Sequence, residues 1–295
     1  MKTWRLRIKQ PQIVIFLSLL LGLSIWLLNP IQIFANDQNA SQNTQISSPT
    51  DFLNSLTDEE RSWLKAHPSI RVAQDPNWPP IEFVDQNGKP SGISNDYLKL
   101  IEQRLGVTFE LVNNISWQES YNLLKTWDID MTTSVALTEE REKFWVFTKP
   151  YMTVPIVILT RSDVTYISSV SELKGHRVAV EKGHVAEEWI NRDHPEIELI
   201  RVENVKEGID LLRNGDVFAF IDNMLVIGYY LAKLKSVDLK IAGWTPYVNA
   251  QAMAVRKDWP VLASILQKAL DSIPESQVNG IYKKWVPLRY EHGFD

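Results

Sequence analysis

The stretch VALTEEREKFWVFTKPY, Val135–Tyr151, is the most informative part of this sequence. It continues from an apolar run, Ile129–Val135, that predicts a strand, and its charged centre predicts the start of a helix. Arg141 would lie in the first turn of that helix, at the open end of a sheet, where a guanidinium group and a helix N-terminus both favour an anion. The alternative is a solvated arginine that pairs with Glu139 or Glu140. The segment alone leaves both interpretations open.

Outward from this stretch, short apolar runs alternate with amphipathic segments along most of the chain. The predicted strands are 70–73, 109–112, 129–135, 154–160, 177–180, 197–202, 217–221 and 250–255, and the predicted helices are 97–105, 117–127, 186–191, 205–212, 224–234 and 262–273. This alternation predicts an α/β fold with sheets of mainly parallel strands and helices on both faces. Ligands in such folds bind beyond the carboxyl ends of the strands. Polar residues that follow predicted strands at those ends include Asp75, Ser134, Asp222 and Asn223.

The bulk composition narrows the class of protein. The 295 residues are enough for two lobes, and the chain has no cysteine, which excludes disulfides, thiol nucleophiles and thiolate metal sites. A net charge of −5 without a basic patch argues against a nucleic-acid partner. The glycines form neither GxGxxG nor a Walker loop. We therefore expect a globular protein that binds no nucleic acid and no cofactor.

The N-terminus predicts export. A basic start is followed by an apolar run at residues 13–28 and by Ala35, which is the layout of a signal peptide cleaved after that residue. An uncleaved membrane anchor is the alternative for residues 1–35, and either places the rest of the chain in the periplasm. Removal of residues 1–35 takes away four basic residues and no acidic residue. The remaining chain has a net charge of −9, which favours a monomer. Residues 36–56 are polar and predict a linker, and Thr57 with Glu60 predicts a capping box at the start of a helix.

Four segments together resemble a known family. They are RVAQDPNWPPIEFVDQNGKPSGISNDYL (71–98), WQESYNLLKTWDIDMTTSVALTEEREKFWVFTKPYM (117–152), LKGHRVAVEKG (173–183) and NGDVFAFIDN (214–223). The chain resembles the family 3 bacterial extracellular solute-binding proteins, which have the two-lobed Venus-flytrap fold of type 2 periplasmic binding proteins. The resemblance implies a solute-binding domain at 57–290, with lobe 1 at 70–160 and 246–290 and lobe 2 at 161–245. Two crossover strands, near 156–162 and 244–252, would join the lobes.

The opening SLTDEERSWLKAHPSIRVAQDPNWPPIEF, 55–83, is similar to one subgroup, the periplasmic domains of virulence-type sensor kinases and of some diguanylate cyclases. The resemblance implies closure of the lobes over a small solute, an amino acid or small carboxylate. The favoured outcome is transport, with an ABC transporter permease as partner. The alternative is a sensing module that acts on an output domain, a kinase or a cyclase.

The resemblance also implies the ligand-binding residues. Arg141 matches the carboxylate-binding arginine and Ser134 a second donor, while Asn223 takes the position expected for the amine-binding aspartate, so that a solute without an ammonium group is favoured. The complete predicted set is Asp75, Trp78, Trp117, Ser134, Arg141, Gly183, His184, Asp222 and Asn223. For the aromatic residues the alternative role is packing, and for His184 it is exposure to solvent.

Enzymatic interpretations have little support in the sequence. It contains neither GxSxG nor HExxH, and the five histidines show no metal-binding spacing with acids. We therefore predict no catalytic residues and no metal site. A dehydratase on the same fold, using Asp75 or Asp222, remains a second alternative.

Overall fold

The computed structural model describes residues 49–286. The predicted signal peptide or anchor and most of the predicted linker therefore lie outside the described residues. Within 49–286, none of the helices combines the length and apolar character needed to cross a bilayer.

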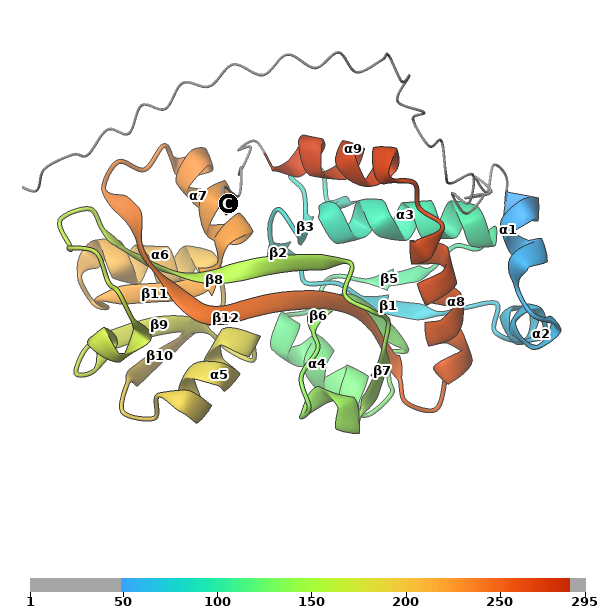
Figure 1. Cartoon of the computed structure of the whole chain (residues 1–295), viewed down its shortest axis with the longest axis horizontal. Coiled ribbons are helices and arrows are strands. Elements are labelled where there is room, and N and C mark those ends of the chain that lie inside the picture. Colours follow the sequence, from blue (N-terminus) through green and yellow to red (C-terminus); the bar gives the residue numbers. More distant parts are fainter. Residues whose placement is uncertain (1–48, 287–295) are drawn as a thin grey trace, which may run out of the picture. The chain divides into compact units, whose positions relative to one another are not determined.

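A nine-stranded sheet forms the framework, in the order β10-β9-β11-β8-β12-β6-β1-β5, with β7 paired to β12. Its strands are β1 (Arg71–Ala73), β5 (Glu110–Val112), β6 (Met131–Ala136), β7 (Trp145–Phe147), β8 (Met152–Arg161), β9 (Arg177–Glu181), β10 (Glu198–Val202), β11 (Ala219–Asn223) and β12 (Leu239–Arg256). β8 and β12 are antiparallel to each other and run through both halves of the described region (Figure 1). The prediction of two crossover strands is confirmed.

The strands on either side of this pair are parallel among themselves. β1, β5 and β6 belong to what we call lobe 1, and β9, β10 and β11 to lobe 2. A small sheet in lobe 1 contains β2 (Asn77–Trp78), β3 (Glu82–Val84) and β4 (Pro90–Ser91). The mainly parallel arrangement follows from the strand-helix alternation of the sequence.

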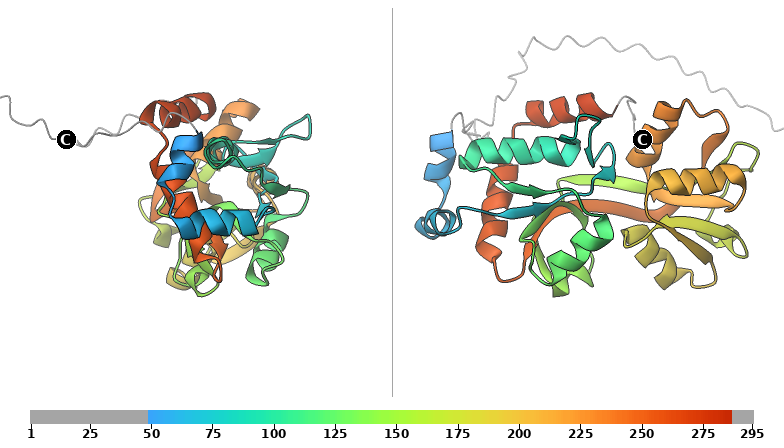
Figure 2. Two further views of the ribbon diagram at one scale, coloured as in Figure 1. Left: turned by 90° about the vertical axis from the view of Figure 1, so that its right-hand side faces the viewer. Right: turned by 180° about the vertical axis from the view of Figure 1, so that it is seen from behind.

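Helices cover both faces of the sheet, as Figures 1 and 2 show. Lobe 1 carries α3 (Ile93–Leu105), α4 (Trp117–Lys125), α8 (Pro260–Asp271), α9 (Glu275–Trp285) and the short 3₁₀ turn η1 (Arg141–Lys143); lobe 2 carries α5 (Val185–Asp193), α6 (Val205–Asn214), α7 (Met224–Leu234) and η2 (Val170–Leu173). The largest core packs α3, α8, α6 and α7 onto the sheet, and two smaller cores lie under α4 and α5. Most of these amphipathic helices thus bury an apolar stripe against strands of their own lobe, whereas α9 packs against α3.

The segment before lobe 1 corrects the predicted linker. Residues 49–55, which we assigned to it, form a helix, α1 (Pro49–Ser55), and Phe52 and Leu56 are buried in the largest core. The next helix, α2 (Asp58–Ala66), has the predicted capping box, in which Thr57 and Glu60 bond each other's backbone amides. Glu60 also accepts from Lys268 of α8 at 2.7 Å, so that this segment is fastened to lobe 1.

Candidate functional site

A cavity lies between the lobes, at the carboxyl ends of β1 and β6 and of β9 in lobe 2. It is lined by Asp75, Trp78, Glu82, Trp117, Ser134, Val135, Ala136, Arg141, His184, Val185, Asn249 and Gln251. The space between these side chains has room for only about one or two water molecules. A solute of amino-acid size requires the lobes to separate before it enters.

Arg141 reaches across this cavity. Its side chain is 2% exposed, and Nη2 and Nε donate to Glu188 Oε1 of α5 at 2.6 and 3.0 Å. The guanidinium also donates to the backbone carbonyls of Ala136 and Gly183. The solvated alternative for Arg141 is therefore wrong, and Glu140 pairs with Lys143 instead.

The local backbone around Arg141 also differs from the prediction. The residue begins η1, a single 3₁₀ turn, and not a regular helix, so no helix N-terminus faces the cavity there. Arg141 is the single lysine or arginine among the described residues that line the cavity. Its Nη2 and Nε already bind one oxygen of the Glu188 carboxylate, and the same pair of donors could bind a solute carboxylate.

The loop Glu181–Val185 of lobe 2 packs against aromatic residues of lobe 1. Trp117 Nε1 donates to the Gly183 carbonyl at 3.1 Å, and Trp78 lies edge-on to the His184 ring, with centroids 5.3 Å apart. Gly183 has φ of +75°, and a Cβ there would lie 2.8 Å from Gln118 Oε1. A side chain at this position would be strained by the positive φ and would displace the end of the Gln118 side chain.

Ser134, which we predicted as a solute donor, bonds Gln251 Oε1 at 2.7 Å, and Gln251 in turn bonds Asn249. Both partners belong to β12, and the sequence prediction missed them. Their spacing of two residues in a strand places them on one face, but only the pairing of β12 with β6 brings that face to the cavity.

Glu82 is another lining residue that the prediction missed. It is buried, and it accepts from the Asp75 backbone amide at 2.9 Å and from Thr133 Oγ1 at 2.7 Å. Burial raises the pKa of Glu82 to about 8, although the two hydrogen bonds by themselves would lower the pKa. At neutral pH the side chain is therefore mostly protonated, and it adds no full negative charge to the cavity wall.

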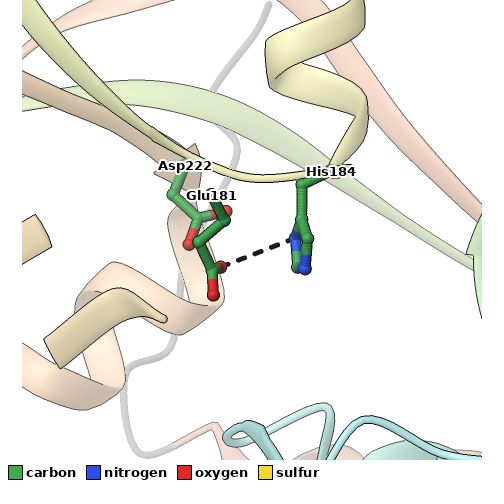
Figure 3. A group of neighbouring side chains, drawn as sticks. All are labelled: Glu181, His184 and Asp222. Carbon is green, nitrogen blue, oxygen red and sulfur yellow. Dashed lines mark ion pairs between the residues drawn. The ribbon is translucent and has the colours of Figure 1, made fainter. Parts of the chain in front are cut away.

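An acidic cluster lies beside the cavity in lobe 2 (Figure 3). The carboxylates of Glu181 and Asp222 are buried, and ligand atoms of these two residues and of His184 lie within 4.8 Å of one another. His184 also faces Asp75 of lobe 1, at 3.6 Å from Nε2 to Oδ2. Burial raises the pKa of Asp222 to about 6, and burial with the nearby charges of Asp222 and Asp75 raises the pKa of Glu181.

Asn223 has a different role from the one the sequence suggested. Its Oδ1 accepts from the Leu225 backbone amide at 2.9 Å and caps α7, and the residue is fully buried. Because neighbouring strand residues point to opposite sides, Asp222 turns toward His184 instead. Asn223 therefore does not line the cavity, and neither does its neighbour Asp222.

Of the nine predicted residues, six line the cavity: Asp75, Trp78, Trp117, Ser134, Arg141 and His184. Gly183 contributes its carbonyl to Trp117 and Arg141. Asp222 lies behind His184, and Asn223 faces α7. The fold thus gathers most of the set, from strands and loops far apart in sequence.

Comparison with known proteins identifies the family. The model of the bacterial extracellular solute-binding proteins, family 3, matches residues 70–287. The chain belongs to this family. Members of the family are binding proteins, and the family is extracellular by description.

The curated relatives divide into sensors and transport proteins. The virulence sensor protein BvgS of Bordetella pertussis is 27% identical over 227 residues, which are 77% of this chain and 18% of BvgS. The sensor protein EvgS of Escherichia coli K12 is 26% identical over 252 residues, 84% of this chain and 21% of EvgS. A putative ABC transporter arginine-binding protein 2 of the same bacterium is 25% identical over 222 residues, 74% of this chain and 90% of that protein. The chain thus spans about a fifth of the length of the two sensors.

Solved structures confirm the Venus-flytrap fold. The periplasmic VFT2 domain of Bordetella pertussis BvgS matches with a TM-score of 0.70 and 27% identity, covering 78% of this chain and 99% of that domain. An ancestral arginine-binding protein bound to arginine matches with a TM-score of 0.69 and 28% identity, covering 75% of this chain and 99% of the other. The resemblance predicted from the four sequence segments is confirmed.

Proposed function

We propose that residues 57–290 form a periplasmic solute-binding domain that senses a small carboxylate or amino acid and passes the signal to an output domain. Residues 1–35 would export the domain or hold it at the inner membrane. The lobes would open to admit the solute and close around it. The domain acts by binding and carries out no reaction.

The observation that carries this proposal is the contact of the buried Arg141 guanidinium, through Nη2 and Nε, with one carboxylate oxygen of the half-buried Glu188 on the other lobe. A solute carboxylate would replace Glu188 on the guanidinium when the lobes reclose. Ser134 and Gln251 would supply neutral hydrogen bonds, and Trp117 an apolar surface. Asp75, which lines the same cavity, would accept from the ammonium group of an amino acid.

The sensing role draws its support from the two sensor proteins among the relatives, BvgS and EvgS. Transport, which the sequence alone favoured, is the second candidate. The arginine-binding relatives support it, since this chain covers most of their length. A permease and an ATPase encoded beside this chain would favour transport, and an output domain in the same reading frame would favour sensing.

Binding and its dependence on Arg141 are tested in one series. A thermal-shift screen of amino acids and small carboxylates identifies the solute, and titration calorimetry then compares the wild type with Arg141→Ala. We expect a loss of affinity of about a hundredfold or more, because a charge-assisted bidentate contact in a closed cavity contributes a few kcal/mol. Lys143→Ala, an exposed change in the same turn, is the control. An Arg141→Ala variant that binds as tightly as the wild type contradicts the proposal.

A further inference from the structure

Three acidic residues meet at the lobe interface without a lysine or arginine partner. Glu181, Asp222 and Asp75 are each at most 5% exposed, and within residues 49–286 no lysine or arginine forms an ion pair with any of them. A buried carboxylate without compensation loses several kcal/mol of solvation. Such a cluster requires either bound protons or a cation.

Two oxygens of the cluster are also unpartnered. Glu181 Oε2 and Asp222 Oδ2 are buried and have no hydrogen-bond partner among the described residues. Both belong to the group whose ligand atoms lie within 4.8 Å of one another (Figure 3). Free acceptor atoms that converge in this way are what a metal ion needs.

His184 completes the group with a nitrogen ligand. Its Nδ1 lies 3.5 Å from Glu181 Oε2, and its Nε2 lies 3.6 Å from Asp75 Oδ2 on the other lobe. Although His184 is the N-cap residue of α5, its side chain makes no capping bond. The ring is thus held between two carboxylates, one on each nitrogen.

We propose that Glu181, His184 and Asp222 bind one divalent transition-metal ion at the lobe interface. Nδ1 of His184 and one oxygen from each acid would be the ligands, and Asp75 would accept the proton on Nε2. A ligating histidine commonly donates its other N–H to a carboxylate in this way. One imidazole and two carboxylates suit Zn²⁺, Mn²⁺, Co²⁺ or Ni²⁺, and the absence of thiolate ligands argues against Cu⁺.

The donor atoms would have to draw together on binding, since bonds of about 2.0–2.2 Å bring tetrahedral ligands to little more than 3 Å apart. Asp75 belongs to lobe 1 and the three ligands to lobe 2. The ion would therefore orient the His184 contact that joins the lobes, and metal occupancy would favour closure. This goes beyond solute binding, because the metal ligands lie outside the contact that Arg141 makes.

The test uses the purified full chain after treatment with a chelator. Titration calorimetry with ZnCl₂, MnCl₂ and NiCl₂ is expected to show one site for at least one ion. Glu181→Gln, His184→Ala and Asp222→Asn should each weaken that site by about a hundredfold or more, and Asp75→Asn by about tenfold or more. Glu196→Gln is the matched control, because Glu196 forms a surface pair with His194 in the same lobe. Its affinity for the metal should equal that of the wild type.

The outcomes separate the metal from its alternatives. If the wild type binds none of the three ions, or if the three ligand variants bind as tightly as the wild type, the proposal is wrong and protons neutralise the cluster. Should a ligand variant not fold, the visible absorption of Co²⁺ added to the wild type reports whether nitrogen and oxygen ligands surround the ion, and a spectrum like that of aqueous Co²⁺ contradicts the site. Solute binding by the metal-free protein is measured separately, so that failure of one proposal leaves the other standing.

Discussion

Glu82 allows a quantitative test of how the cavity wall is built. Burial raises its pKa from 4.5 to about 8, whereas the side chain regains the ordinary value when the chain unfolds. An acid with a raised folded pKa holds its proton more tightly in the folded state. The contribution of Glu82 to the free energy of unfolding therefore falls as the pH rises from about 4.5 to about 8, and it no longer changes at higher pH.

The magnitude follows from the two pKa values. A shift of one unit corresponds to about 1.4 kcal/mol, so the wild type should lose about 3–4 kcal/mol of stability through Glu82 between pH 5 and pH 8. Glu82→Gln keeps the size of the side chain and an acceptor for the Asp75 amide. The variant should therefore match the wild type within about 1 kcal/mol at pH 5 and exceed it by about 4 kcal/mol at pH 8.

Urea unfolding of both proteins at half-unit steps of pH measures this difference directly, because the other titrating groups are common to both. Glu59→Gln, an exposed change on α2, is the control and should show no such trend. Glu82→Gln should gain stability over the wild type as the pH rises. If the difference in unfolding free energy stays constant or falls from pH 5 to pH 8, the reasoning is refuted.

Two further predictions concern the cavity and the backbone. Glu188→Gln should raise the affinity for carboxylate solutes about tenfold, because the neutral amide competes less well than the carboxylate for Arg141. Titration calorimetry with the tightest-binding carboxylate from the screen measures this change, and an unchanged affinity would argue against Glu188 as a competitor. Gly92→Ala should cost about 3 kcal/mol or more in urea unfolding, because φ is +119° and the new Cβ would lie 2.4 Å from the Ile81 carbonyl oxygen. Gly88→Ala, at φ of +75° with open space around it, should cost only about 1 kcal/mol, and equal costs would contradict the role of the contact.

The sequence came close to the true boundaries wherever local signals acted alone. The capping box at Thr57 and Glu60 formed as predicted. The helix predicted at 205–212 is Val205–Asn214, which ends at Gly215 in a left-handed conformation. Helix caps and helical periodicity depend on residues a few positions apart, so they can be predicted from the sequence without knowledge of the fold.

Local signals were weakest in short segments. Residues 49–55 appeared to be polar linker, because their apolar contact with the core rests on Phe52 and Leu53, followed by Leu56 just after α1. The strand predicted at 250–255 is the end of an 18-residue strand, β12, whose earlier part mixes buried, half-buried and exposed residues and contains a glycine and a proline. Packing against distant elements decided both cases.

The sequence by itself determined the α/β class, the family and half of the residues that line the cavity, because strand ends and family motifs consist of residues close together in the sequence. Only the tertiary structure decided which charged side chains lie next to one another. Arg141 and Glu188 are 47 residues apart, and Glu181 and Asp222 belong to different strands, so their pairing depends on how the lobes and strands are brought together. The choice between Asp222 and Asn223 was a matter of one residue, and in a strand one residue reverses the direction of the side chain. That direction is fixed by the pairing of β11 with β8 and by the helix that Asn223 caps, neither of which the sequence pattern contains.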